Sequence, residues 1–405
     1  MNENSNVVIV GAGPCGSFTA YNLAKHGQHV SVYEEHGRIG LPAHCAGHLS
    51  IKGLRQLGLH NLPAEIIENT FYGANFYSPA GNRFTVRLQK PVTCVVNRAK
   101  FDSYLAEKAE NAGAHYCLNS RVETLEKANG FTSRALIRQN KTYITKDTKL
   151  IVDAEGISSR LTRQAGLHAP SKLLKTVEAE VENVRNTELD TVDVYLGHKY
   201  APDFYAWLIP KETGKAKIGL ATRTGNPKDL LQNLILKNPS ASRKLRSARI
   251  VEATFHTITL GGLIPQMFSN GFLAVGDAAS QVKPTTGGGV IFGMNCAKIA
   301  SQVAAEAIER NDFSKEFLSS YQRKCTELVG FDMRIMLEIR RILDRLPDRK
   351  LDEAVSLCTE FGLDKAFSRV DDIDFQGQSL LRILSNPRIF AALMGFFFVC
   401  VFTNP

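Results

Sequence analysis

Short apolar runs alternate with helical patterns at the start of the chain. Residues 6–10 form an apolar run that ends at Gly11, which predicts a buried strand of a parallel sheet. Residues 14–27 carry apolar side chains at helical spacing and stop at a glycine, and residues 29–33 form a second apolar run. This order predicts a β-α-β unit, from which open parallel sheets covered by helices are built.

Two patterns share the rest of the chain up to about residue 310. The strand and helix pattern returns, with a helix predicted over 98–112, buried strands over 149–153 and 271–275, and a long helix from about Gly289. Between these segments, residues 71–96 and 175–262 alternate apolar and polar positions, which is typical of an antiparallel sheet. From about residue 314 onward the pattern is helical.

The interleaving of these patterns predicts a discontinuous nucleotide-binding domain with a sheet domain inserted into it. We expect the first domain to comprise 1–70, 97–174 and 263–312. The inserted sheet domain takes 71–96 and 175–262, and a helical C-terminal region takes 313–405.

The first strand is followed at once by a glycine-rich loop that matches G-x-G-x-x-G and opens a helix. Glycines in such a loop let backbone amides approach a pyrophosphate at the helix N-terminus. At the end of the second strand, Glu34 is placed to accept both hydroxyl hydrogens of an adenosine ribose. The residues expected to bind a dinucleotide here are Gly11, Gly13, Pro14, Cys15, Gly16, Glu34 and the adjacent Glu35.

A second set of motifs lies far from the first. A strand runs into Gly276-Asp277, and three glycines at 287–289 then precede a helix. This arrangement resembles the second flavin fingerprint of the p-hydroxybenzoate-hydroxylase-like and geranylgeranyl-reductase-like flavoproteins. The resemblance implies FAD, with Asp277 on the ribityl chain and a positive helix end that stabilises an anionic reduced flavin. The residues it assigns to the cofactor are Asp277, Gly288, Gly289 and Val290.

Two further segments match the same superfamily. Arg98 opens a predicted helix and corresponds to the arginine by which these proteins contact FAD, although a surface arginine is the alternative interpretation. The stretch from Asp153 to Arg160 resembles the motif D-G-x-x-S-x-x-R, but it carries Ala154-Glu155 between the aspartate and the glycine.

Two other motifs narrow the resemblance to geranylgeranyl reductases, including archaeal digeranylgeranylglycerophospholipid reductases. Residues 40–47 (GLPAHCAG) match G-x-P-x-x-C followed by a small residue. Residues 202–210 (PDFYAWLIP) match P-x-x-Y-x-W-x-F-P, with Ile209 in place of phenylalanine. The resemblance covers about residues 5–310. It implies a Rossmann-like FAD-binding domain of the p-hydroxybenzoate hydroxylase type, with an inserted antiparallel β-sheet substrate domain and C-terminal helices.

The same resemblance implies roles for the residues of both motifs. Cys45, with Ala46 and Gly47, lies against the flavin, and Cys45 positions flavin or substrate as the candidate catalytic residue. From the residues alone, Cys45 is a small buried side chain or a redox thiol, and a redox dithiol would need a nearby partner that the sequence does not show. Tyr205 and Trp207 have the same parity on a strand and project to one face, where they contact the substrate chain. Periodicity alone would place Trp207 in the core.

Composition and charge then limit the partners. The formal net charge of +9 suits a diphosphate, a phospholipid headgroup or an acidic membrane surface, and its scattered positive residues argue against nucleic acid. The eight cysteines contain no C-x-x-C pair, and no cluster has metal-ligand spacing, so we expect neither a metal site nor an iron–sulfur cluster. Reduced thiols and the absence of a signal peptide predict a cytoplasmic location.

The helical tail carries two features that bear on the membrane. Residues 333–346 form a basic amphipathic helix, which we expect to pack on its own domain rather than on a bilayer. Residues 389–402 contain no charged side chain but are too few to span a hydrocarbon core, which needs about 20 residues. This run either closes a lipid tunnel or enters the bilayer interface. Arg382 and Arg388 before it fit the second alternative, which predicts peripheral association with the inner face of the cell membrane.

Together these features predict an FAD-dependent reductase that saturates C=C bonds of geranylgeranyl chains, in a polyprenyl lipid or in geranylgeranyl diphosphate. The resemblance implies an external electron donor, which is NADPH, ferredoxin or reduced deazaflavin in related proteins. Two other hypotheses stay open from the sequence. One is an FAD-dependent aromatic-ring monooxygenase, which shares the scaffold, and the other is a non-catalytic flavin-binding protein at a membrane.

Overall fold

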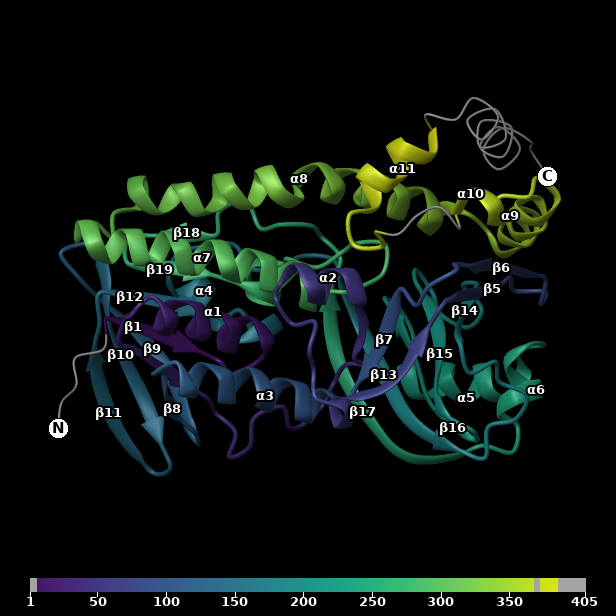
Figure 1. Ribbon diagram of the computed structural model, residues 1–405, viewed down its shortest axis with the longest axis horizontal. Coiled ribbons are helices and arrows are strands. Elements are labelled where there is room, and N and C mark those ends of the chain that lie inside the picture. The colour runs from purple at the N-terminus through teal and green to yellow at the C-terminus, as the bar shows by residue number, and fades with distance from the viewer. Residues whose placement is uncertain (1–5, 368–371, 385–405) are drawn as a thin grey trace. The chain divides into compact units, whose positions relative to one another are not determined.

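The computed structural model describes residues 6–367 and 372–384 (Figure 1). The chain forms two compact units, each assembled from three segments. The first unit comprises Met1–Ala43, Arg98–Lys172 and Thr259–Arg334, and the second comprises His44–Asn97, Leu173–Ile258 and Ile335–Pro405. The division into three domains stated above stays a prediction.

The first unit is built on a six-stranded sheet whose central strands are parallel. Four of its strands are buried along their whole length, which explains why they are continuous apolar runs. In spatial order the strands are β18 (Phe268–Ser269), β19 (Phe272–Ala274), β12 (Leu150–Asp153), β1 (Val7–Val10), β2 (Val30–Tyr33) and β8 (His115–Cys117).

Helices cover this sheet at the positions that the periodicity predicts. Helix α1 packs against α3 and α7, and α7 is tied to the start of α8 by the ion pair between Lys324 and Glu306 at 3.2 Å (Figure 1). Pro14 stands in the first turn of α1, where its missing N–H costs nothing. The helices are α1 (Pro14–Lys25), α3 (Arg98–Asn111), α4 (Arg160–Gln164), α7 (Val290–Arg310) and α8 (Lys315–Arg345).

A three-stranded antiparallel ribbon was not among the predicted elements. It consists of β9 (Ser120–Ala128), β10 (Phe131–Gln139) and β11 (Thr142–Asp147). Much of its surface is exposed and charged, so the apolar alternation that identifies a strand is weak here. Its turn does carry a signal, because Asn129-Gly130 takes positive φ at both positions, as a tight hairpin requires.

The second unit contains two sheets. Its seven-stranded sheet is antiparallel at the pairs β13–β16, β16–β15, β15–β14 and β5–β6, whereas β14 and β5 pair in parallel. In spatial order its strands are β17 (Arg249–Thr259), β13 (Leu173–Glu182), β16 (Lys215–Thr222), β15 (Tyr205–Glu212), β14 (Thr191–Leu196), β5 (Gly73–Tyr77) and β6 (Arg83–Arg87). The smaller sheet consists of β3 (His48–Ser50), β7 (Thr93–Val96) and β4 (Ile67–Phe71).

The alternating segments therefore hold more than one sheet. Residues 71–96 are shared between the large and the small sheet, and 175–262 also contain the helices α5 (Pro227–Lys237) and α6 (Ala241–Leu245). Asn226 caps α5 by accepting a hydrogen bond from the amide of Lys228 at 3.0 Å. Leu231 and Leu234 of α5 are buried against the large sheet, which accounts for the apolar positions assigned to strands.

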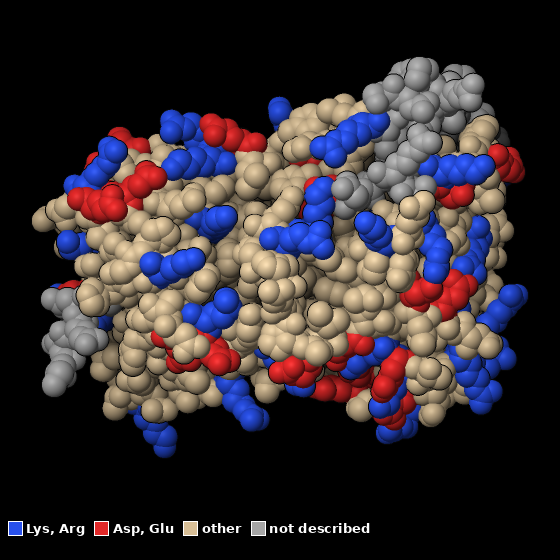
Figure 2. All heavy atoms as spheres, in the orientation of Figure 1, with Lys and Arg blue, Asp and Glu red and all other residues tan. Residues whose placement is uncertain are grey.

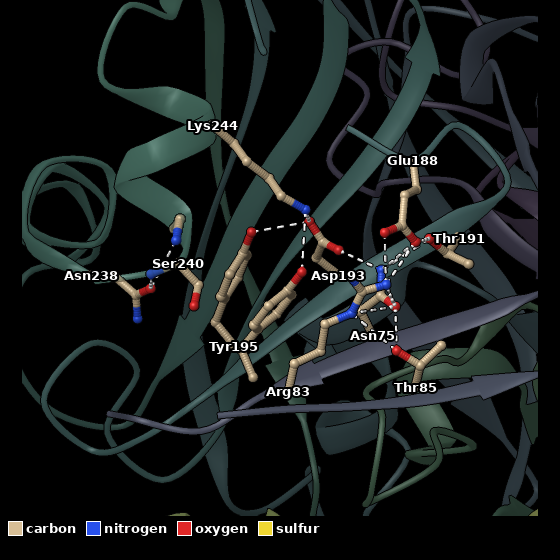
Figure 3. A network of polar contacts seen from close by, with 12 residues as sticks. Asn75, Arg83, Thr85, Glu188, Thr191, Asp193, Tyr195, Asn238, Ser240 and Lys244 are labelled. Carbon is tan, nitrogen blue, oxygen red and sulfur yellow. Dashed lines mark hydrogen bonds and ion pairs between the residues drawn. The ribbon is translucent and has the colours of Figure 1, made fainter. Parts of the chain in front are cut away.

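A buried polar network closes one end of the large sheet (Figure 3). Asp193 on β14 accepts hydrogen bonds from Lys244 at 2.6 Å, Tyr195 at 3.1 Å and Asn75 at 3.0 Å. Asn75 in turn accepts from Arg83 at 2.7 Å. These contacts give the buried carboxylate of Asp193 hydrogen-bond partners, and they join β14, β5, β6 and α6. We therefore assign the network a structural role.

The C-terminal region of the second unit is helical. The helix over 333–346 packs by its apolar side, since Met336 is fully buried, whereas Arg334, Arg341 and Arg345 are exposed. Arg340 is buried and bonds Asp344 at 2.6 Å. This region also contains α9 (Asp348–Glu360), α10 (Asp364–Phe367) and α11 (Gln376–Leu384), whereas α2 (Ile51–Gln56) lies near the start of the second unit. Within the described residues, no helix is both long enough and apolar enough to cross a bilayer. The run 389–402 lies outside those residues.

The molecular surface carries its charges in a mixed pattern. Lys and Arg are spread over the face drawn in Figure 2 and alternate with Asp and Glu. This distribution agrees with the scattered positions of basic residues along the sequence. It gives no single basic stripe on that face.

Asp153 ends β12 and is fully buried in the first unit. Its carboxylate accepts hydrogen bonds from the hydroxyl of Thr162 at 2.7 Å and from the amide of Glu155 at 3.0 Å. Burial first, and then the charge of Glu155, raise the pKa of Asp153 from 3.8 to about 7. The folded state therefore favours the protonated acid, and this contribution to stability is lost as the pH rises through about 7.

We predict that Asp153→Asn removes this pH dependence. The free energy of unfolding of the variant minus that of the wild type should rise by roughly 2 kcal/mol between about pH 5 and about pH 8. Urea denaturation at saturating FAD measures the free energy of unfolding of both proteins at each pH. Asp312→Asn is the control, because that exposed carboxylate has a lowered pKa and is ionised throughout this range. A difference that is flat with pH for Asp153→Asn would contradict the prediction.

Candidate functional site

The glycine-rich loop brings three backbone segments of the first unit into close contact. A Cβ on Gly16 would lie 2.0 Å from the carbonyl oxygen of Gly11. Gly11 itself has φ of +94°, and a Cβ there would lie 2.5 Å from the carbonyl oxygen of Ala154. The first and last glycines of the motif are therefore required by the packing of α1 on β1 and on the end of β12.

Gly13 has a different environment, which fits a ligand. A Cβ on Gly13 would meet nothing within 4 Å, so the space at the N-terminus of α1 is open. Gly13 is the N-cap, and no side chain caps the first amides of the helix. Uncapped amides facing open space at a positive helix end are suited to the pyrophosphate of FAD.

Glu34 is fixed against this loop, whereas Glu35 is not. One carboxylate oxygen of Glu34 accepts a hydrogen bond from the amide of Ala12 at 2.8 Å, and the other accepts from the amide of His36 at 2.9 Å. Glu35 is half exposed and pairs with Arg121 at 3.3 Å. The structure thus brings Glu34, and not its neighbour, to the dinucleotide loop.

Arg98 opens α3 and is held by Asp102, which was not among the predicted site residues. Its guanidinium forms two bonds to the carboxylate of Asp102, at 3.0 and 2.8 Å, and both side chains are largely buried. Burial raises the pKa of Asp102, and Arg98 opposes that rise. The sequence signal was available, since an arginine and an aspartate four residues apart in a helix face each other. Arg98 is thereby oriented and is not a freely exposed surface arginine.

Asp277 lies half-buried in the turn after β19, close to the start of α7. Its Oδ1 is 2.9 Å from the place that a Cβ on Gly289 would take, so the glycine admits the carboxylate. Burial raises the pKa of Asp277, and the charge of Arg98 lowers it. No side chain caps α7 at Gly289. The structure therefore gathers Asp277, Arg98 and the uncapped end of α7 in the first unit.

Cys15 connects the two glycine motifs by packing. Its Sγ is 3.0 Å from the position of a Cβ on Gly276 and 2.5 Å from that on Gly293. The thiol side chain fills the space that these two glycines leave, and it brings α1 against α7. Cys15 thus has a packing role beside the loop whose backbone it belongs to.

Gln281 and Tyr321 stabilise the turn at Asp277 by hydrogen bonds to its backbone and to the strand before it. The Gln281 side chain accepts a hydrogen bond from the amide of Gly276 at 2.7 Å and donates one to the Tyr321 hydroxyl at 2.7 Å. Tyr321 donates to the carbonyl of Ala274 at 2.9 Å. Neither residue was singled out from sequence, because Tyr321 lies on α8, 40 positions from the glutamine.

Cys45, Ala46 and Gly47, called the Cys45 loop below, belong to the second unit. Backbone hydrogen bonds anchor this loop. Cys45 is half-buried, and its Sγ accepts a hydrogen bond from the amide of Gly47 at 3.4 Å. The carbonyl of Gly47 accepts from the amide of Val96 at 2.9 Å. The carbonyl of Ala46 accepts from the ammonium of Lys217 at 3.1 Å. The thiol therefore has a defined position at the start of the small sheet.

Trp207 lies in the same apolar cluster as this loop. Its ring covers Gly219 on the adjacent strand, where a Cβ would come within 2.5 Å of the indole. Tyr205 meets Trp207 edge to face, with ring centroids 6.0 Å apart. The buried members of the cluster are Phe71, Val95, Val192 and Ile209, with Ala46, Ala74 and Trp207 packed against them. Two motifs more than 150 residues apart are thus brought together within one unit.

Comparison with known proteins bears on the cofactor and on the family of this chain. A family model described as an FAD binding domain matches residues 4–330, which confirms the expected cofactor. The chain is 33% identical over 356 residues to digeranylgeranylglycerophospholipid reductase of Methanocaldococcus jannaschii, covering 87% of this chain and 90% of that protein. The enzyme of the same name from Methanosarcina acetivorans is 32% identical over 375 residues, covering 89% and 90%.

Solved structures show the same fold. A geranylgeranyl bacteriochlorophyll reductase-like protein from Thermoplasma acidophilum has a TM-score of 0.85 at 27% identity, covering 97% of this chain and 99% of that one. A flavin-dependent brominase has a TM-score of 0.68 at 20% identity, covering 95% and 99%, which shows likeness of fold alone. The predicted fold class is confirmed. On these grounds the chain belongs to the digeranylgeranylglycerophospholipid reductase family of FAD-binding proteins.

Proposed function

We propose that this protein uses FAD to saturate C=C bonds of geranylgeranyl chains carried by a glycerophospholipid, with geranylgeranyl diphosphate as the smaller substrate of the same chemistry. The observation that carries the proposal is the joint apolar cluster of the second unit. In that cluster Ala46, which follows Cys45, and Trp207 pack on the same buried side chains. An apolar surface with aromatic rings suits a polyprenyl chain, since it buries area without adding charge.

In the first unit, the chain's residues bind and orient the cofactor. The open amides at Gly13 hold the pyrophosphate, and Glu34 holds the ribose next to them. Asp277, within the electrostatic influence of Arg98, would hold the ribityl chain, and the uncapped amides at the start of α7 would stabilise negative charge on the reduced flavin. Bound FAD, once reduced, supplies the hydride that saturates one alkene carbon, and a proton is delivered to the other.

In the second unit, the residues bind the substrate and exclude water. Trp207 and Tyr205 form a rigid aromatic wall, because the indole is packed on Gly219 and the phenol stacks with Phe204 at 4.3 Å. Cys45 takes the role of positioning the alkene, as the candidate catalytic residue. A fixed wall lowers the entropy that the flexible chain loses during the reaction.

The remaining partners follow from the chemistry. Each reduced bond consumes two electrons, so an external donor must reduce FAD again, and NADPH, ferredoxin or reduced deazaflavin would serve. A substrate with two geranylgeranyl chains resides in a bilayer, so we place the protein in the cytoplasm and peripherally on the inner face of the cell membrane.

The first test of this function is the product. FAD-loaded protein, reduced with dithionite and incubated with digeranylgeranylglyceryl phospholipid, should add about 2 mass units per double bond. Mass spectrometry of the extracted lipid measures this gain. Incorporation of oxygen with consumption of dioxygen would instead indicate a monooxygenase. Flavin that is reduced but leaves every offered lipid unchanged would support a non-catalytic flavin protein.

The second test concerns the aromatic wall. Trp207→Ala should lower turnover of the polyprenyl lipid about tenfold or more, because the chain loses the surface that orients it, while FAD content stays near that of the wild type. Phe255→Ala is the matched control, since this phenylalanine of the same sheet is half exposed. If the variant loses FAD along with activity, Trp207 has a structural role and the proposed contact with the substrate is wrong.

The third test separates the two adjacent glutamates. Glu34→Ala should weaken FAD binding about tenfold or more, because its carboxylate is fixed at the dinucleotide loop. Glu35→Ala should leave the affinity near that of the wild type, because that side chain pairs with Arg121 at the surface. Fluorescence titration of the apoprotein with FAD measures both. Equal losses would show that the register assigned to Glu34 is wrong.

A further inference from the structure

A buried lysine of the second unit is surrounded by oxygens from four segments. The side chain of Lys217, on β16, is 6% exposed. Its ammonium lies 2.8 Å from a carboxylate oxygen of Glu68 and 3.8 Å from one of Glu180. It also donates to the backbone carbonyls of Ala46 at 3.1 Å and Val96 at 3.3 Å. A buried ammonium is tolerated only with such compensation.

These contacts join the two sheets of the second unit. Ala46 leads into β3, Glu68 lies on β4 and Val96 ends β7, so all three belong to the small sheet or its approach. Lys217 belongs to the large sheet. Burial alone would raise the pKa of Glu68, but Lys217 and Lys211 lower it below its ordinary value, so the carboxylate stays charged. One ammonium therefore links the sheets by an ion pair and two carbonyl bonds.

Lys217 is linked to both motifs assigned to the substrate, to one by its ammonium and to the other by its backbone. Ala46 is the residue between Cys45 and Gly47, and its carbonyl is bonded directly to Lys217. On the other side, Lys217 is paired with Ile209 in the ladder of β16 and β15, two positions from the pair of Gly219 with Trp207. The lysine thus connects the thiol-bearing loop to the strand that carries the aromatic wall.

We propose that Lys217 is a positioning residue for the reduction, which sets the separation between the Cys45 loop and Trp207. This inference rests on the proposed function of these two motifs. Loss of the ammonium frees the Ala46 carbonyl and leaves Glu68 with one fewer partner, so the loop moves relative to the aromatic strand. A displaced loop presents the geranylgeranyl alkene in the wrong place while the flavin unit remains intact.

Lys211 provides a matched control on the same strand pair. Its ammonium bonds the same two carboxylates, Glu68 at 2.8 Å and Glu180 at 3.1 Å. Within the described part of the chain, it forms no hydrogen bond to a carbonyl of the Cys45 loop. Lys211→Met therefore removes an equal charge from the same ion cluster without releasing the loop.

The experiment uses the full-length, FAD-loaded protein. We expect Lys217→Met to raise the rate at which iodoacetamide alkylates Cys45 about fivefold, and to lower kcat on the lipid about tenfold with FAD retained. Cys94 and Cys296 are buried at 2% and 0% exposure and should stay protected. Lys211→Met should match the wild type in alkylation and kcat. Peptide mass spectrometry resolves the three thiols.

Three results would overturn the proposal. The first is an unchanged alkylation rate at Cys45, and the second is joint alkylation of all three thiols, which indicates general destabilisation. The third is faster alkylation of Cys45 with kcat unchanged. Should Lys217→Met not fold, Glu68→Gln is measured against the same outcomes, because it removes the charge that holds the ammonium.

The two readouts separate this proposal from the function on which it rests. Alkylation of Cys45 requires no turnover, so it reports the position of the loop even if the lipid is not the substrate. A wild-type protein that reduces no polyprenyl lipid would refute the proposed function. The response of Cys45 to Lys217→Met would then still show whether the lysine holds the loop.

Discussion

The cofactor half of this protein depends on backbone segments that approach closer than any side chain allows. A Cβ on Gly16, Gly11 or Gly293 would each collide with a neighbouring atom at 2.5 Å or less. These contacts draw β1, α1, the end of β12 and α7 to one point. Because α1 and α7 then present uncapped N-termini in the same unit, two positive helix ends are available to an anionic dinucleotide.

The second unit achieves its geometry by a different means, which is buried charge. The ion pair between Asp193 and Lys244 joins β14 of the large sheet to α6. The ion pair between Lys217 and Glu68 joins the large sheet to the small one. Both ammonium groups have several oxygen or hydroxyl partners, so the desolvation cost is offset by directional contacts. Buried ion pairs favour one arrangement over others that an apolar interface would accept, and here they define where the Cys45 loop meets the aromatic strand.

The two units contribute unequally to the choice of reaction. A flavin-dependent brominase shares the fold at a TM-score of 0.68, so the scaffold alone does not decide what the flavin acts on. The family model described as an FAD binding domain matches residues 4–330, which include the glycine motifs and Asp277. The features on which the proposed reaction rests lie in the second unit, where Ala46 of the thiol loop and Trp207 share one apolar cluster.

The sequence by itself determined the β-α-β start, the flavin motifs and the helix at Arg98, because each is a local pattern whose meaning lies within a few tens of residues. It did not show the exposed ribbon β9–β11, whose charged faces weaken the alternation, nor the parallel pairing of β14 with β5. Lys217 and Gln281 were invisible for a further reason. Gln281 bonds Tyr321, 40 positions away, and Lys217 bonds Ala46, 171 positions away, and only tertiary packing selects such contacts. A periodic pattern reports that a segment is buried, but not which distant segment buries it.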